Sequence, residues 1–74
     1  MPSATVVGPG FKRVVPFEVG QLVRDVAGRA ASEAGGTIPS EPIFIVDGNK
    51  VQPQEEITSP EDVHLTVALV TVNG

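Results

Sequence analysis

The sequence predicts an α+β domain in which one β-sheet packs against a single helix. Three observations predict this class. Short β-prone segments flank glycine-containing turns at residues 8–10 and 47–48. Apolar residues recur at three- and four-residue intervals between residues 19 and 34, and another β-prone segment runs from residue 63. A sheet and an amphipathic helix each have one apolar side, and packing these sides together gives a two-layer domain.

A β-hairpin is expected first. Residues 4–7 (Ala-Thr-Val-Val) form a strand, Gly8-Pro9-Gly10 forms the turn, and residues 11–15 return. Pro16 has no N–H group to give to a strand ladder. The second strand is therefore expected to lie at an edge of the sheet or to end there.

A helix is predicted over residues 19–34, with Gly28 inside it and Gly35-Gly36 ending it in a left-handed cap. Gly28 costs about 1 kcal/mol relative to alanine, so it either allows close packing or simply weakens the helix. The apolar stripe is narrow and ends in small residues, which predicts close approach to the sheet. Its members are Val19, Leu22, Val23, Val26, Ala30 and Ala34.

The second half of the chain predicts three more strands. Residues 43–46 (Ile-Phe-Ile-Val) are continuously apolar, which indicates burial on both faces or an inner position. Asp47-Gly48 signals a tight turn, and residues 49–51 return from it. Residues 52–62 are polar and predict a turn or a one-turn helix, with Ser59 as a candidate cap and Ile57 as the anchor to the core.

The last strand alternates apolar and polar residues from Val63 to Leu69, which predicts a half-buried strand. Val70 and Val72 fall on the opposite face from Leu65 and Leu69. Three explanations stay open: a bulge, burial on both faces, or an exposed apolar patch for binding.

Composition restricts the class of protein. Seventy-four residues make one domain, 1–74, near the lower size limit for folding without cross-links. There are no cysteines, which agrees with a reducing compartment, and we expect a cytoplasmic protein. The net charge of −4 argues against nucleic acid binding. We find neither a signal peptide nor an apolar run approaching the roughly 20 residues that span a bilayer.

Catalysis and metal binding have little support in the residues. His64 is the lone histidine and lies on the polar side of its strand, where a solvated side chain is expected. The carboxylates at 55, 56, 61 and 62 lack the spacing and glycine of a calcium loop. We therefore expect neither a catalytic residue, nor a metal, nor a cofactor.

Three stretches resemble a known family. Residues 45–51 (Ile-Val-Asp-Gly-Asn-Lys-Val) are similar to its strand–turn–strand "V-N-G-x-x-V", and Ile57 with residues 61–63 is similar to "L-x-x-G-D-x-V". The spacing from Asp62 to Gly74 also agrees. The family is the ubiquitin-like β-grasp family, nearest its sulfur-carrier branch of the molybdopterin-synthase small subunit and the thiamine sulfur carrier.

The resemblance implies a fold and a chemistry. The fold is a β-grasp, with one mixed sheet and one packed helix. In the sulfur carriers an activating enzyme adenylates the terminal glycine carboxylate, which then becomes a thiocarboxylate. Gly74 matches that position, and Asn73 stands where the family has a second glycine.

The residues themselves favour a small, acidic, non-enzymatic protein-interaction module. Its candidate contact residues are Val70 and Val72 at the centre and Asn73 and Gly74 at the C-terminus, with either Lys12 and Arg13 or the acidic loop at the rim. The partner is expected to be a protein, or another copy of the chain in a larger assembly. Two alternatives remain: a sulfur carrier or ubiquitin-like modifier attached through Gly74, and a structural accessory subunit of a complex or virus particle.

Overall fold

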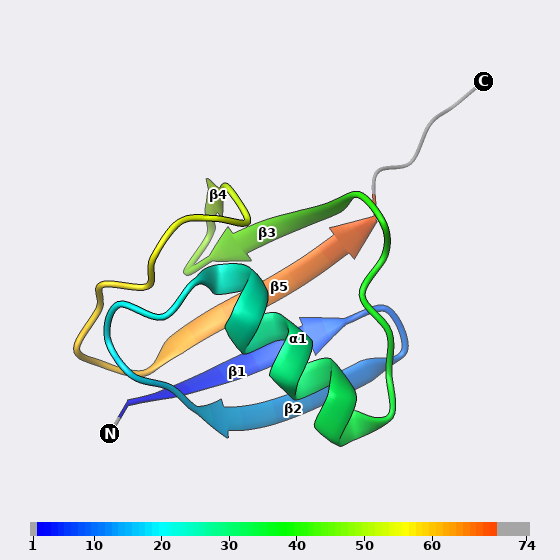
Figure 1. Ribbon diagram of the computed structural model, residues 1–74, viewed down its shortest axis with the longest axis horizontal. Helices are drawn as coiled ribbons and strands as arrows, with labels where there is room; N and C mark the ends of the chain where they lie inside the picture. The colour runs from blue at the N-terminus through cyan, green and yellow to red at the C-terminus, as the bar shows by residue number, and fades with distance from the viewer. Residues whose placement is uncertain (1, 70–74) are drawn as a thin grey trace.

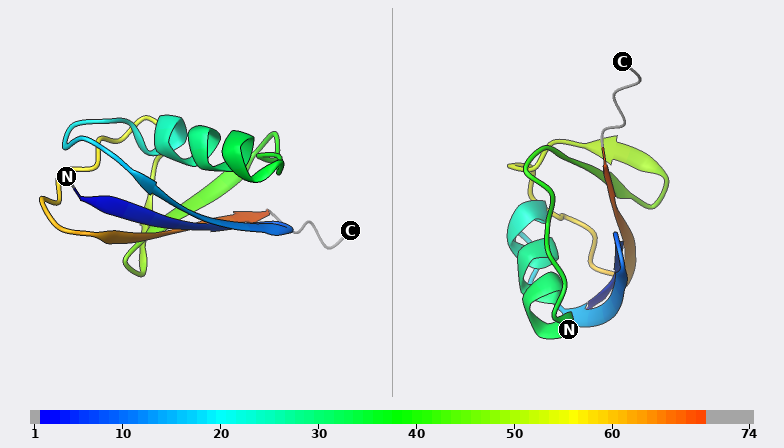
Figure 2. Two further views of the ribbon diagram at one scale, coloured as in Figure 1. Left: turned by 90° about the horizontal axis from the view of Figure 1, so that it is seen from below. Right: turned by 90° about the vertical axis from the view of Figure 1, so that its right-hand side faces the viewer.

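The computed structural model describes residues 2–69 and confirms the α+β class. One mixed sheet of five strands carries a single helix on one face (Figures 1 and 2). The strand order is β2-β1-β5-β3-β4, and neighbouring strands are antiparallel except for the parallel pair β1 and β5. This two-layer arrangement is compatible with a β-grasp fold.

Both predicted hairpins and the final strand are confirmed to within one or two residues, the usual uncertainty of element boundaries. Pro16 ends β2, and β2 is an edge strand, as its proline predicted. The apolar segment 43–46 lies in an inner strand, between β5 and β4. The elements are β1 Ser3–Gly8, β2 Phe11–Pro16, α1 Val23–Ala34, β3 Pro42–Val46, β4 Asn49–Val51 and β5 Val63–Leu69.

The predicted start of the helix at Val19 is wrong, because α1 begins at Val23. Val19 is 53% exposed and lies in a turn. Leu22 precedes the helix and provides no side-chain cap. Instead, the first helical amides of Val23 and Arg24 donate to the carbonyls of Glu55 and Pro53, at 2.9 and 3.1 Å. The helix therefore begins where backbone acceptors from a distant loop become available.

The C-terminal end of α1 follows the sequence. Gly35 adopts a left-handed conformation with φ of 73°, and Gly36 N donates to the carbonyl of Ala31 at 2.8 Å. Inside the helix, a Cβ added to Gly28 would meet nothing within 4 Å. Of the two interpretations of Gly28, the structure excludes close packing, and the glycine only weakens the helix.

The core lies between α1 and the sheet. Its largest fully buried side chains are Phe17, Phe44 and Leu65. Of the two alanines in the predicted stripe, Ala30 is buried, whereas Ala34 is exposed. Ala27 and Ala31, which the stripe did not include, are also buried. The remaining members of the core are Ala4, Val6, Phe11, Val15, Val23, Val26, Ile57, Val63 and Val67.

The loop between β4 and β5 is fixed to the rest of the molecule by Ile57, as predicted. Ile57 is 3% exposed, its N–H donates to the Gln21 carbonyl, and its carbonyl accepts from Gly20 N, both at 2.8 Å. A one-turn helix does not follow: residues 60 and 61 form a bend. Ser59 Oγ nonetheless accepts a hydrogen bond from Glu61 N at 3.2 Å, so the capping contact forms without a helix.

Within residues 2–69, no helix is both long enough and apolar enough to cross a membrane.

Candidate protein-interaction surface

The face of the sheet opposite α1 carries no helix (Figure 2). Side chains alternate between the two faces of a strand, and those on the helix side, such as Val6 and Leu65, are fully buried. Their sequence neighbours project from the other side. We call this side the open face; it consists of Ser3, Thr5, Val7, Lys12, Val14, Pro16, Ile43, Ile45, Lys50, His64, Thr66 and Ala68.

One row of side chains crosses the whole open face at right angles to the strands. Val7 pairs with Lys12 on one side and with Thr66 on the other, and Ile45 pairs with Thr66 and Lys50. In strand order this transverse row is Lys12, Val7, Thr66, Ile45 and Lys50. The three central residues are half-buried and the two lysines are exposed. The row therefore has two aliphatic residues and a threonine in the middle and a lysine at each end.

The charge of the open face differs from that of the molecule. The chain has nine acidic and five basic residues, yet the residues of the open face include two lysines, one histidine and no carboxylate. Two acids border the face near the start of β5, where Asp47 Oδ1 accepts from His64 N and Asp62 Oδ1 accepts from Ser3 N, both at 2.9 Å, and exposed Glu41 precedes β3 at the other end. A basic, partly apolar surface on an acidic protein favours an acidic partner.

The structure separates the predicted pair Lys12 and Arg13. Lys12 belongs to the open face, whereas Arg13 lies on the helix side of β2, where its Nη2 is 3.3 Å from Glu33 Oε1 of α1. Both side chains of that ion pair are more than 40% exposed, so its contribution to stability is small. Of the two residues, only Lys12 shares a face with the half-exposed aliphatic side chains.

The other predicted contact residues are Val70, Val72, Asn73 and Gly74, and they lie outside the described residues. They follow β5, the middle strand of the sheet, directly in sequence. Val14, which the sequence did not single out, is 58% exposed on the open face, on the strand next to β1. It extends the apolar part of this surface toward the β2 edge.

His64 is exposed, as predicted for a surface histidine. Its backbone is held by Asp47 on both sides: Asp47 Oδ1 accepts from His64 N, and Asp47 N donates to the His64 carbonyl at 2.9 Å. Among residues 2–69, no three or more His, Asp or Glu side chains gather as ligands for a metal ion. The hydrogen bonds of His64 with Asp47 join the start of β5 to the turn between β3 and β4.

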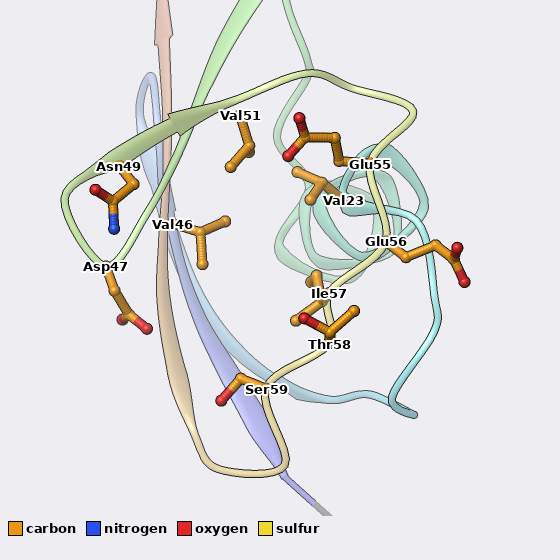
Figure 3. A pocket seen from close by; sticks show the side chains of 10 residues that line it. All are labelled: Val23, Val46, Asp47, Asn49, Val51, Glu55, Glu56, Ile57, Thr58 and Ser59. Atoms are coloured by element: carbon orange, nitrogen blue, oxygen red, sulfur yellow. The ribbon is translucent and has the colours of Figure 1, made fainter.

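A pocket of about 250 Å³ opens between the β3–β4 hairpin and the loop at residues 55–59 (Figure 3). Val23, Val46, Val51 and Ile57 turn their aliphatic side chains into it, and Glu55 lies beside Val51 and Val23. Its lining contains carboxylates and hydroxyls but neither histidine nor a basic residue. The pocket is thus a hollow at the margin of the core, lined by aliphatic side chains, carboxylates and hydroxyls.

Arg29 of α1 is half-buried, and its Nε and Nη2 atoms are buried without a hydrogen-bond partner among the described residues. Glu33, one helical turn further on, pairs with Arg13 instead.

Neither a protein-family model nor a curated protein sequence matches this chain. The candidate surface therefore rests on the geometry of the sheet.

Sequence reasoning missed Lys50, Ile45, Val7 and Thr66 as surface residues. Two signals were present. Val7 and Lys12 flank the Pro9-Gly10 turn at equal distances, and Ile45 and Lys50 flank the Asp47-Gly48 turn in the same way. Each hairpin therefore placed one lysine beside one aliphatic residue. The pairing of both hairpins with Thr66 of β5 has no local signal.

Proposed function

We propose that this chain is a small, non-enzymatic protein-interaction module that binds its partner through the open face of its sheet. The observation that carries the proposal is the transverse row, with half-exposed Val7, Thr66 and Ile45 at its centre and an exposed lysine at each end. Protein interfaces combine such an apolar centre with a polar rim. Val70 and Val72 follow β5 in sequence and remain candidates for extending this surface.

The test is partner retention by the tagged protein purified from its native source. Ile45→Asp should reduce the retained partner by at least about tenfold, because it places a charge at the apolar centre of the contact. Ile45→Thr should reduce it less, while keeping the β-branched shape that suits a strand. Quantitative mass spectrometry of the co-purifying proteins measures both effects.

Val19→Asp is the matched control, since Val19 is also an exposed aliphatic residue but lies in the turn before α1. It should retain the partner fully. Thermal unfolding of each variant separates lost binding from lost folding. The proposal fails if no protein is retained in stoichiometric amount, or if folded Ile45→Thr and Val19→Asp retain it equally well.

A second candidate function is that of a sulfur carrier or ubiquitin-like modifier acting through Gly74. The observation in its favour is the mixed sheet with one packed helix, which is compatible with the β-grasp fold that the resemblance implies. Its partner would be an activating enzyme. Intact-mass measurement of the protein from its native source should then show a thiocarboxylate or a conjugate at Gly74, and deletion of Gly74 should abolish it. An unmodified C-terminus in every preparation would exclude this function.

A further inference from the structure

We infer that the pocket beside the β3–β4 hairpin binds a small linear aliphatic diamine. The hydrocarbon chain of the ligand lies on the aliphatic lining, and a carboxylate holds the ammonium group at each end. The pocket is on the helix side of the sheet, so this site is separate from the open face and goes beyond the proposed function. The inference depends on the size of the pocket, its aliphatic lining, and the position of its carboxylates.

The size of the pocket limits the ligand. Its volume is about 250 Å³. This is larger than a cavity of roughly 150 Å³ that accepts benzene. It is smaller than the roughly 300–1,000 Å³ of pockets that bind drug-sized ligands and cofactors. The pocket therefore suits a ligand with few non-hydrogen atoms, such as a short alkyl chain with a polar group at each end.

The lining determines the body of the ligand. Val23, Val46, Val51 and Ile57 turn aliphatic side chains into the pocket (Figure 3). Val46 and Val51 are half-buried, so part of their apolar surface is available to a ligand. None of the described lining residues is aromatic, whereas sites for quaternary ammonium ions use aromatic rings. An unbranched chain of methylene groups fits this surface, and its transfer out of water favours binding.

Carboxylates flank the aliphatic lining on two sides. Asp47 belongs to the β3–β4 turn, and its Oδ1 accepts from His64 N at 2.9 Å. A carboxylate has about four acceptor positions, so this hydrogen bond leaves others for a ligand. Glu55 is held near the N-terminus of α1, where its carbonyl accepts from Val23 N at 2.9 Å. The side chains of Asp47 and Glu55 lie on opposite sides of Val46 (Figure 3).

These charges select a cation with two positive ends. None of the described lining residues is basic, so an anion would be repelled. A neutral ligand would take the carboxylates out of water without an ionic partner for them. A primary ammonium group has three N–H donors and forms charge-assisted hydrogen bonds with a carboxylate. One amine would reach one carboxylate, whereas a diamine places one ammonium group at Asp47 and the other at Glu55.

A metal ion is a poorer ligand for this pocket. A hard cation such as Ca²⁺ takes six to eight oxygen ligands. Much of the lining is aliphatic, and residues 2–69 contain no group of three or more His, Asp or Glu side chains that could hold a metal ion. The hydrocarbon chain of a diamine uses the aliphatic surface that a bare ion would leave in contact with water.

The test is an NMR titration of the isotope-labelled full chain at low ionic strength, because salt screens exposed ion pairs. The probe is 1,5-diaminopentane, which has an ammonium group at each end of a five-carbon chain. Pentylamine is a control of similar length with one ammonium group. Pentane-1,5-diol is a control of similar length without charge.

The diamine should bind with a dissociation constant of about 1 mM, the order expected for a ligand with so few atoms. The signals of Val46, Val51 and Ile57 should shift. Pentylamine should bind about twofold to fivefold more weakly, because it lacks one exposed ion pair. The diol lacks both ion pairs and should bind at least about tenfold more weakly.

Variants of the protein test each end of the ligand. Asp47→Asn and Glu55→Gln should each weaken diamine binding about twofold to fivefold and leave pentylamine and the diamine with similar affinities. Asparagine keeps an acceptor for His64 N and tolerates the φ of 49° at position 47. Glu41→Gln is the matched control, because it changes the net charge equally at an exposed position before β3. It should leave the affinity unchanged, and thermal unfolding confirms that each variant is folded.

Several results would overturn the inference. The diamine could produce no shifts at millimolar concentration, or pentylamine or the diol could bind as tightly as the diamine. Shifts outside the pocket, or equal weakening by Glu41→Gln and Glu55→Gln, would show a general attraction of cations to an acidic chain. Equal shifts with magnesium chloride would show the same. All these results leave the proposed interaction module intact, because its test depends on Ile45 and the open face.

Discussion

The ring of Phe11 lies between two glycines, Gly8 at the end of β1 and Gly36 just after α1. A Cβ built on Gly8 would collide with the ring, and one built on Gly36 would lie 2.6 Å from Phe11 Cδ1. Neither glycine has a positive φ. Glycine is therefore needed at these two positions for steric reasons. The Phe11 ring packs against both glycines and so connects the first hairpin to the end of the helix.

Gly28 and Gly36 should respond in opposite ways to replacement by alanine. Gly28→Ala should stabilise the protein by about 0.5–1 kcal/mol, because the added methyl meets nothing and the helix gains propensity. Gly36→Ala should destabilise it by about 1–3 kcal/mol through overpacking against Phe11. Urea unfolding measures both changes. Equal stability of Gly36→Ala and the parent would mean that the Phe11 ring relocates at no cost.

At the scale of elements, the N-terminus of α1 and the loop before β5 support each other. Gly20, Val23 and Arg24 donate to carbonyls of residues 53–57, and Ile57 N donates back to Gln21. Leu22 and Glu56 form an isolated bridge between the same segments. This accounts for the wrong prediction of the helix start: the apolar spacing from Val19 has a helical period, but acceptors for the first turn come from a loop 30 residues away, which periodicity does not reveal.

Ile57→Ala should loosen this pair of segments. Removing most of a side chain that is 3% exposed should cost about 2–5 kcal/mol. Hydrogen exchange of the Gly20, Val23 and Arg24 amides should accelerate more than exchange within β1 and β5. Thr58→Ala, at the exposed neighbouring position, is the control and should change neither quantity by much. Uniform acceleration in all elements would instead show that the loop unfolds only together with the whole domain.

At the scale of the whole molecule, local sequence patterns predicted the helix and strands. Pairing between strands distant in sequence determines which side chains lie together on the open face. The alternation in β5 correctly placed Val63, Leu65 and Val67 in the core. The two turns placed Lys12 beside Val7 and Lys50 beside Ile45. What joins these pairs into one row is Thr66, which pairs with Val7 and Ile45 from strands distant in sequence. Such pairings depend on the packing of the whole chain and cannot be read from local patterns in a single sequence.

The split of Lys12 from Arg13 follows from the same physics. Two adjacent basic residues look like one patch in a sequence, but successive side chains of a strand point to opposite faces. In β2 this places Arg13 against Glu33 and leaves Lys12 on the open face. The register of the sheet thus assigns a different environment to each half of a basic pair.

The parallel pairing of β1 with β5 also sets the order of events during synthesis. Ser3 N donates to Asp62 Oδ1, 59 residues later in the chain, and β5 lies between the two hairpins. Until β5 has been synthesised, the β1–β2 hairpin and the β3–β4 hairpin have no strand to join them, and isolated two-stranded hairpins are at best marginally stable in water. We therefore expect a chain that lacks β5 to leave the inner edges of β1 and β3 unpaired, and the native sheet to close only when its middle strand is available.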